Sequence, residues 1–230
     1  HVRSRRQRQM CIRDSSYSDA IWHSETQMFN GHGVAKYLLS KAVRDAGIKV
    51  VFTGEGADEM LGGYPFFRVD AVKHNPALSE AQKSALFAEI LGTNEASRAI
   101  MLPNEVNSPA TDAVRRRLGW VPTVVHTMES MSNGLAPFFS NDYAAYIHGH
   151  SPIVAALDRL PIGQRMTGRD HLNQSLYLYS KTALPNFILS YLGDRMEMAH
   201  SVEGRVPFLD HRIAEAAARI PVDMKVKGIR

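Results

Sequence analysis

A short apolar run, Val50 to Phe52, stands between a predicted helix and a glycine-rich turn. The run is β-branched and aromatic and is bounded by turn residues, which is typical of a strand that is buried on both faces of a parallel sheet. Residues 34–46 ahead of it have helical spacing, and Gly47 is placed to cap that helix at its C-terminus. A helix that leads into a buried strand indicates one unit of an open α/β sheet, and such sheets bind ligands beyond the carboxyl ends of their strands.

Further helices are predicted downstream by their caps and their spacing. Ser79 to Gln82 is a capping-box signature that opens one helix. Residues 112–118 and 170–182 also have helical patterns, and the second of these helices is predicted to break at residues 184–185, Leu-Pro. Residues 119–139 mix proline, glycine, serine and asparagine with apolar residues, so we predict loops there. The pattern indicates an α/β fold with a large helical share.

The turn after the strand, residues 53–59, carries the clearest chemistry. Gly54 and Gly56 allow unusual backbone angles and let a ligand approach the main chain closely. If the turn opens a helix, its free N–H groups can hold anionic oxygens, but Glu55 and Asp58 would repel phosphate unless a hard cation lay between them. Mg²⁺ takes one or two carboxylates together with phosphate oxygens and waters. These residues therefore suggest a magnesium–nucleotide site with a spare carboxylate, and an acidic helix N-terminus stabilised by its dipole is the alternative.

Two long motifs resemble one protein family. Residues 53–64, Thr-Gly-Glu-Gly-Ala-Asp-Glu-Met-Leu-Gly-Gly-Tyr, are similar to the signature of the synthetase domain of glutamine-hydrolysing asparagine synthetases. Residues 193–212, which begin Gly-Asp-Arg-Met-Glu-Met-Ala-His, are similar to a second block of that family and follow in the family's order. The resemblance covers about residues 17–230 and is loose between the motifs. It implies an adenine-nucleotide α-hydrolase-like (PP-loop ATP pyrophosphatase) domain, which is α/β, incomplete in this chain and largely helical.

The resemblance also implies a reaction. In the family, ATP activates a carboxylate as its adenylate and releases pyrophosphate, and ammonia from a glutaminase domain then displaces AMP to give an amide. By position, Thr53, Gly54 and Gly56 would bind the nucleotide. Asp58 would hold Mg²⁺ and pyrophosphate, and Glu55 would be catalytic, accepting a proton from ammonia. The implied enzyme is an ATP-dependent carbon–nitrogen ligase that makes asparagine from aspartate, with ATP and Mg²⁺ as cofactors.

A loop ahead of the helix at residues 34–46 offers candidate pocket residues. The family has a glutamate and a loop here that help to form the substrate pocket. Glu25 matches that region, and Asn30 and His32 are candidate contacts. An ordinary surface loop is the alternative for each of them.

The second motif places four charges near the apolar run at residues 206–209: Asp194, Arg195, Glu203 and Arg205. Burying an unpaired charge is costly, so the pattern favours an ion-pair network that braces the active-site wall. Direct contact of Glu203 or Arg205 with the substrate is the alternative.

Composition and charge argue against nucleic-acid-binding and membrane proteins. The chain has 230 residues, 44% of them hydrophobic, which is enough to bury a sizeable core. Its formal charge of +4 tempts a nucleic-acid interpretation, but five arginines lie in the first 13 residues, and acidic residues slightly outnumber basic ones in the rest. We therefore expect neither nucleic acid nor a membrane surface as a partner. No apolar run reaches transmembrane length and no signal sequence opens the chain, so a cytoplasmic location is the default.

The first 15 residues differ from the rest of the chain. Residues 1–15 are basic, lack periodicity and contain Cys11, and we predict a disordered or artefactual tail. A basic arm for RNA or membrane is the alternative. No cysteine follows it, so the body of the chain, residues 16–230, has neither a disulfide nor a thiolate metal site.

The extent of the domain and the identity of the carboxylate that is amidated leave further alternatives open. The family's glutaminase domain, its pyrophosphate loop and its C-terminal lysine segment do not occur in this chain, so residues 16–230 are expected to be a partial domain that is inactive alone. Related β-lactam- or peptide-cyclising synthetases and sugar amidotransferases share the nucleotide turn. A non-catalytic helical interaction module is the alternative of another class. The expected partners are aspartate, ATP, ammonia from glutamine and the glutaminase domain of the same parent chain, and a homodimer is left open.

Overall fold

The structure is a computed structural model that describes residues 16–28, 30–92 and 104–226, without the side chains of residues 148 and 149. The predicted tail at residues 1–15 lies outside the described part. The chain divides into two compact units, one built from the segments up to Ala57 and from Lys181 to Glu215, the other from the remaining segments. No described helix combines the length and apolar character needed to cross a membrane.

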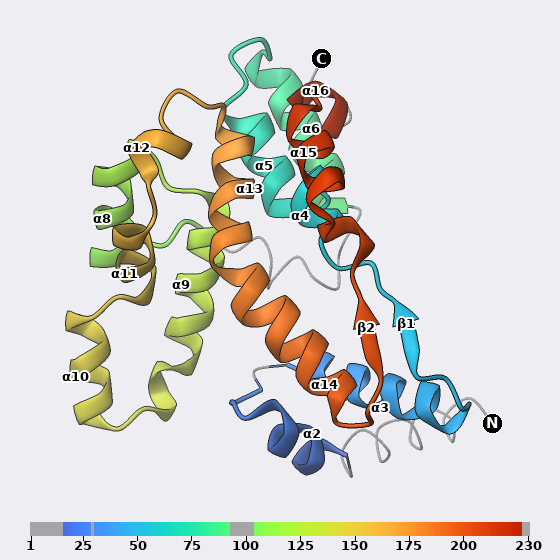
Figure 1. The fold of residues 1–230 in the computed structure, drawn as a ribbon. Helices are drawn as coiled ribbons and strands as arrows, with labels where there is room; N and C mark the ends of the chain where they lie inside the picture. The colour runs from blue at the N-terminus through green and yellow to red at the C-terminus, as the bar shows by residue number, and fades with distance from the viewer. Residues whose placement is uncertain (1–15, 29, 93–103, 227–230) are drawn as a thin grey trace. The chain divides into compact units, whose positions relative to one another are not determined.

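The first unit contains a parallel pair of strands (Figure 1), β1 (Val50–Phe52) and β2 (Glu203–Arg205). Their register sets Val50 opposite Glu203. The predicted strand and its parallel pairing are confirmed. Its predicted burial on both faces is wrong, because the side chain of Phe52 is 76% exposed. The described sheet has two strands, and so narrow a sheet offers too little surface for a helical layer on each face.

Helices of the first unit pack around a small apolar core. They are α2 (Tyr17–Ser24), α3 (His32–Asp45), the π-helix η2 (Leu184–Asp194) and α14 (Arg195–Met198), followed after β2 by the 3₁₀ turn η3 (Pro207–Leu209). Ala20, Val34 and Met196 are fully buried at its centre. The predicted end of α3 is confirmed, because Gly47 has a φ of +78° and the N–H of Ile48 donates to the carbonyl of Val43 at 3.2 Å.

The predicted end of an α-helix just before residues 184–185 is confirmed, because α13 (His171–Lys181) ends at Lys181, but the sequence did not predict that a second helix follows at once. A π-helix, η2, begins at Leu184 shortly after α13, and Pro185 lies in its first turn. Proline is tolerated there because the first N–H groups of a helix have no partner within the helix.

The second unit is helical in its described part. Its elements are α4 (Ala57–Leu61), α5 (Pro65–Lys73), α6 (Glu80–Gly92), α8 (Pro109–Leu118), α9 (Thr123–Leu135), η1 (Ala136–Phe138), α10 (Asn141–Gly149), α11 (Pro152–Arg159), α12 (Ile162–Arg165), α13 and α16 (Val222–Lys225). The first residue of α4 and the last residue of α13 belong to the first unit, and α15 (His211–Arg219) is shared between the units. The capping box that opens α6 is confirmed, because the N–H of Ser79 donates to Gln82 Oε1 at 2.9 Å and the N–H of Gln82 donates to Ser79 Oγ at 3.3 Å.

The predicted loop at residues 119–139 is wrong, because α9 and η1 occupy most of it. The cap position of α9 is Pro122, which has no capping side chain. Instead, the N–H and the hydroxyl of Thr123 donate to Asp70 Oδ1, at 3.0 and 2.6 Å. Val124 is buried, so distant capping and packing stabilise a helix that lacks the usual local start signal.

Candidate functional site

The turn that the sequence predicts to bind nucleotide follows β1 directly. The N–H of Thr53 donates to the carbonyl of Arg205 at 2.9 Å, and the N–H of Ala57 donates to the carbonyl of Gly54 at 3.2 Å. α4 begins at Ala57, so the turn does open a helix. The turn therefore lies at the carboxyl end of the parallel strand pair, which is where α/β sheets bind ligands.

The two glycines of this turn have different surroundings. A Cβ on Gly54 would meet no described atom within 4 Å, so the main chain there is accessible to a ligand. Gly56 is buried with a φ of +96°, and a Cβ there would lie 2.6 Å from Leu209 Cγ. The fold itself therefore requires glycine at position 56, and contact of Gly56 with a nucleotide stays a prediction.

Glu55 is held by a lysine that the sequence analysis did not find. Lys36 Nζ on α3 donates to Glu55 Oε1 at 2.5 Å and also lies 3.8 Å from Glu197 Oε1 on α14. Burial raises the pKa of Glu55, but hydrogen bonds, led by the one from Lys36, outweigh burial and hold the pKa below its usual range. Glu55 is therefore ionised at neutral pH and is able to accept a proton.

Asp58 begins the second unit and carries an exposed side chain in the first turn of α4. Its carboxylate lies over Gly63, where a Cβ would be 2.9 Å from Asp58 Cγ. One accessible carboxylate fits Mg²⁺, because this ion binds proteins through one or two carboxylates and completes its shell with phosphates and waters. Among the described residues, no group of three or more His, Cys, Asp or Glu side chains could hold a metal ion by itself.

Two of the predicted pocket residues, Glu25 and Asn30, have structural partners. Glu25 Oε2 lies 3.5 Å from a guanidinium nitrogen of Arg195, whose side chain also donates to the carbonyl of Ser24. Asn30 Oδ1 accepts the N–H of His32 at 3.0 Å, which fixes the start of α3. Contact of Glu25, Asn30 and His32 with a substrate stays a prediction.

The ion-pair network predicted for the second motif is confirmed only in part, because Glu203 and Arg205 pair with each other and Arg195 pairs outside the motif. In the described structure, Arg195 pairs with Glu25, whereas Arg205 Nε donates to Glu203 Oε1 at 2.8 Å. Glu203 and Arg205 are two positions apart on one strand, so their side chains leave the same face. Both side chains are exposed, and such a pair contributes little to stability.

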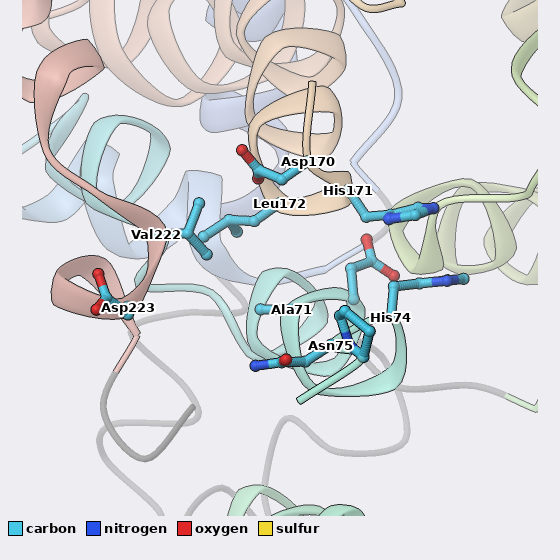
Figure 2. Close-up of a pocket in the computed structure, with 10 residues that line it drawn as sticks. Ala71, His74, Asn75, Asp170, His171, Leu172, Val222 and Asp223 are labelled. Atoms are coloured by element: carbon cyan, nitrogen blue, oxygen red, sulfur yellow. The ribbon is translucent and has the colours of Figure 1, made fainter. Parts of the chain in front are cut away.

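The second unit also contains a cavity of about 300 Å³ between α5, the start of α13 and α16 (Figure 2). The rings of His74 and His171 stack in its wall, with centroids 4.0 Å apart and planes 10° apart. Burial, with His171 nearby, lowers the pKa of His74 to about 4, so this ring is neutral at neutral pH. None of the site residues predicted from the sequence lines this cavity.

Asp70, in the same wall, gives a prediction about pH and stability. The residue is 1% exposed, and burial raises its pKa to about 6 although Ser175 and Thr123 donate to it. The folded protein then binds more protons at Asp70 than the unfolded chain does between about pH 4 and 6, so this group's contribution to the free energy of unfolding falls by up to about 2–3 kcal/mol as pH rises across that range. Asp70→Asn should remove that fall.

Urea denaturation of wild type and Asp70→Asn across this pH range measures the effect as a difference between the two proteins. The difference is needed because the lowered pKa of His74 contributes the opposite slope in the same range. A difference in unfolding free energy that does not vary with pH would contradict the prediction.

Comparisons with known proteins agree with the two motifs. The family model for asparagine synthase matches residues 5–230. The chain is 32% identical to amidase chyE of Penicillium rubens over 220 residues, which cover 93% of this chain and 32% of that protein. It is 29% identical to amidase chry2 of Gibberella zeae, over 93% of this chain and 32% of the relative.

A third relative is glutamine-hydrolysing asparagine synthetase 1 of Bacillus subtilis, which is 24% identical over 90% of this chain and 30% of its own length. The chain thus spans about a third of the length of these curated relatives. No solved structure matches it significantly.

Proposed function

The chain belongs to the asparagine synthase family, and we propose that it is part of an ATP-dependent carbon–nitrogen ligase that converts a carboxylate into an amide. The single observation that carries this proposal is Glu55, held ionised by Lys36 in the turn that follows β1. We further propose that the helices and the parallel strand pair are part of an adenine-nucleotide α-hydrolase-like domain, which acts in the cytoplasm.

Each residue of the turn has a role in this proposal. The open main chain at Gly54, beside Thr53, would receive the nucleotide. The carboxylate of Asp58 would hold Mg²⁺, which when bound would offset negative charge on the departing pyrophosphate. Glu55 would accept the proton that the attacking nitrogen loses.

The acceptor we propose first is aspartate, with ammonia supplied from glutamine by a glutaminase domain of the same parent chain. A second candidate is amidation of a different carboxylic acid. The specific observation in its favour is that two relatives named amidases share 32% and 29% identity with this chain, against 24% for the asparagine synthetase of Bacillus subtilis.

Pyrophosphate release by the intact parent protein tests the proposal. The protein is given ATP and Mg²⁺, with aspartate, with other carboxylic acids, or with no acid. Release that depends on aspartate supports asparagine formation, and release that depends on another acid supports the second candidate. No release with any acid, from folded protein, would favour a non-catalytic helical interaction module.

Glu55→Gln in the parent protein should reduce amide formation about a hundredfold or more, the scale of a lost general base. Glutamine hydrolysis should continue, because the change leaves the glutaminase domain untouched. Amide is measured by mass spectrometry and glutamate by a coupled assay. Glu80→Gln, an exposed change on α6, is the matched control. Amide formation by Glu55→Gln at the wild-type rate would exclude the proposed role.

A further inference from the structure

Three charged side chains of the first unit, Lys36, Glu55 and Glu197, meet beside the nucleotide turn. Their side chains are 26%, 14% and 12% exposed, so water screens the charges only in part. Lys36 Nζ contacts both carboxylates but lies nearer to Glu55, at 2.5 Å against 3.8 Å. The ammonium group of Lys36 thus forms ion pairs with both carboxylates.

The two oxygens of Glu55 are not equivalent. Oε1 accepts from Lys36, whereas Oε2 is buried and has no hydrogen-bond partner in the described part of the chain. A buried acceptor without a partner is costly, and such an atom in a native structure calls for an explanation. An ionised carboxylate that is fixed through one oxygen and has no partner at the other is well suited to accept a proton from a ligand that reaches the unpartnered oxygen.

Glu197 is accommodated by a glycine of the neighbouring strand. Gly204 lies opposite Val51 in the strand pair, and a Cβ on Gly204 would be 2.8 Å from Glu197 Oε1 and nearer still to the second oxygen. Burial, with the Glu55 carboxylate and Asp194 nearby, raises the pKa of Glu197, although Lys36 opposes this. Of the two acids, Glu55 therefore holds its charge more firmly and keeps the shorter contact with Lys36.

We propose that Lys36 is a positioning residue for Glu55, fixing Oε1 so that Oε2 faces the reacting nitrogen, while Glu197, in the space left by Gly204, holds the lysine. This inference rests on the proposed function. In that reaction the nitrogen of ammonia attacks the acyl carbon of the adenylate, and the new C–N bond leaves a positive charge on the nitrogen. Glu55 Oε2 takes a proton from this nitrogen, the bond from the acyl carbon to the AMP oxygen breaks, and AMP leaves with the electron pair.

Steady-state kinetics of the parent protein test this role. Lys36→Gln should lower kcat for amide formation about tenfold to a hundredfold and leave KM for the acceptor unchanged, because the lysine acts through Glu55. The acidic limb of the kcat profile should move to higher pH, because loss of the cation lets the pKa of Glu55 rise. Lys36→Arg should recover most of the activity.

Two further variants separate positioning from a role in folding. Lys41→Gln, on the same helix, removes an exposed lysine that pairs with Asp45 at 2.5 Å, and should behave as wild type. Glu197→Gln removes a negative charge near Glu55 and leaves Lys36 in place, so the acidic limb should move to lower pH, opposite to the effect of Lys36→Gln. General destabilisation of the fold would not move the acidic limb in opposite directions in these two variants, so opposite shifts would indicate a specific effect on Glu55.

The outcomes distinguish the inference from the proposed function. Active wild type, together with a Lys36→Gln variant of unchanged kcat and unchanged acidic limb, would overturn the positioning role and leave the function standing. If Lys36→Gln does not fold, the acidic limb of the kcat profile of Glu197→Gln tests the inference instead. A limb that stays at its wild-type pH in that variant would overturn the inference. Wild type that forms no amide with any acid overturns the proposed function and this inference with it.

Discussion

Asp58→Asn in the intact parent protein is expected to reduce magnesium-dependent pyrophosphate release by at least about a hundredfold, because a bound metal ion contributes several kcal/mol of charge stabilisation in the transition state and the variant loses the carboxylate proposed to hold it. The change removes the ligand's charge and keeps its volume. The Asp58 side chain is exposed, so the fold should survive. The measurement is the initial rate of pyrophosphate release at several Mg²⁺ concentrations, and excess Mg²⁺ should recover part of the rate.

Asp112→Asn is the matched control for this experiment. Asp112 is an exposed carboxylate of the same unit, on α8, and pairs with Arg115 at 2.7 Å. Exposed pairs of this kind contribute little, so both the stability and the rate should stay at their wild-type values. Release by Asp58→Asn at the rate of this control would remove Asp58 from the metal site.

The elements that the sequence predicted correctly are those whose signals are local. The capping box at Ser79 and the glycine that ends α3 each involve residues within a few positions of one another. The strand at Val50–Phe52 is marked by side chains that favour extended backbone. Such signals can be found in any short window of sequence.

The failures depend on residues that are distant in the sequence. The start of α9 is held by Asp70, 53 positions before Thr123, so nothing near Pro122 marks the helix. The burial expected of β1 depends on how many strands the sheet has and on what covers it. Neither property is encoded in the strand itself.

The residues of the candidate site also differ in whether local sequence predicts them. The motif located Glu55 in its turn, because the residues that shape this turn are contiguous. Lys36 and Glu197 were missed, because their meeting with Glu55 depends on how α3 and α14 pack beside the strands. Gly204 could be explained only after the carboxylate of Glu197 was found above it.

Gly56→Ala is expected to lower the free energy of unfolding by about 2–6 kcal/mol. A residue other than glycine at a φ of +96° costs about 1–3 kcal/mol. The added methyl group would also press on Leu209, 2.6 Å from its Cγ, and overpacking of this kind adds about 1–3 kcal/mol. Urea denaturation measures the loss as a lower midpoint at an unchanged slope.

Gly54→Ala, two positions earlier, separates the demands of the fold from those of the ligand. A Cβ there meets no described atom within 4 Å, so the variant should unfold at nearly the wild-type urea concentration. If Gly54 lets the nucleotide approach the main chain, the same methyl group should weaken ATP binding in the parent protein, as measured by calorimetry. The surroundings of position 54 are open, whereas Leu209 fills the space at position 56. Equal destabilisation by Gly54→Ala and Gly56→Ala would therefore contradict this prediction.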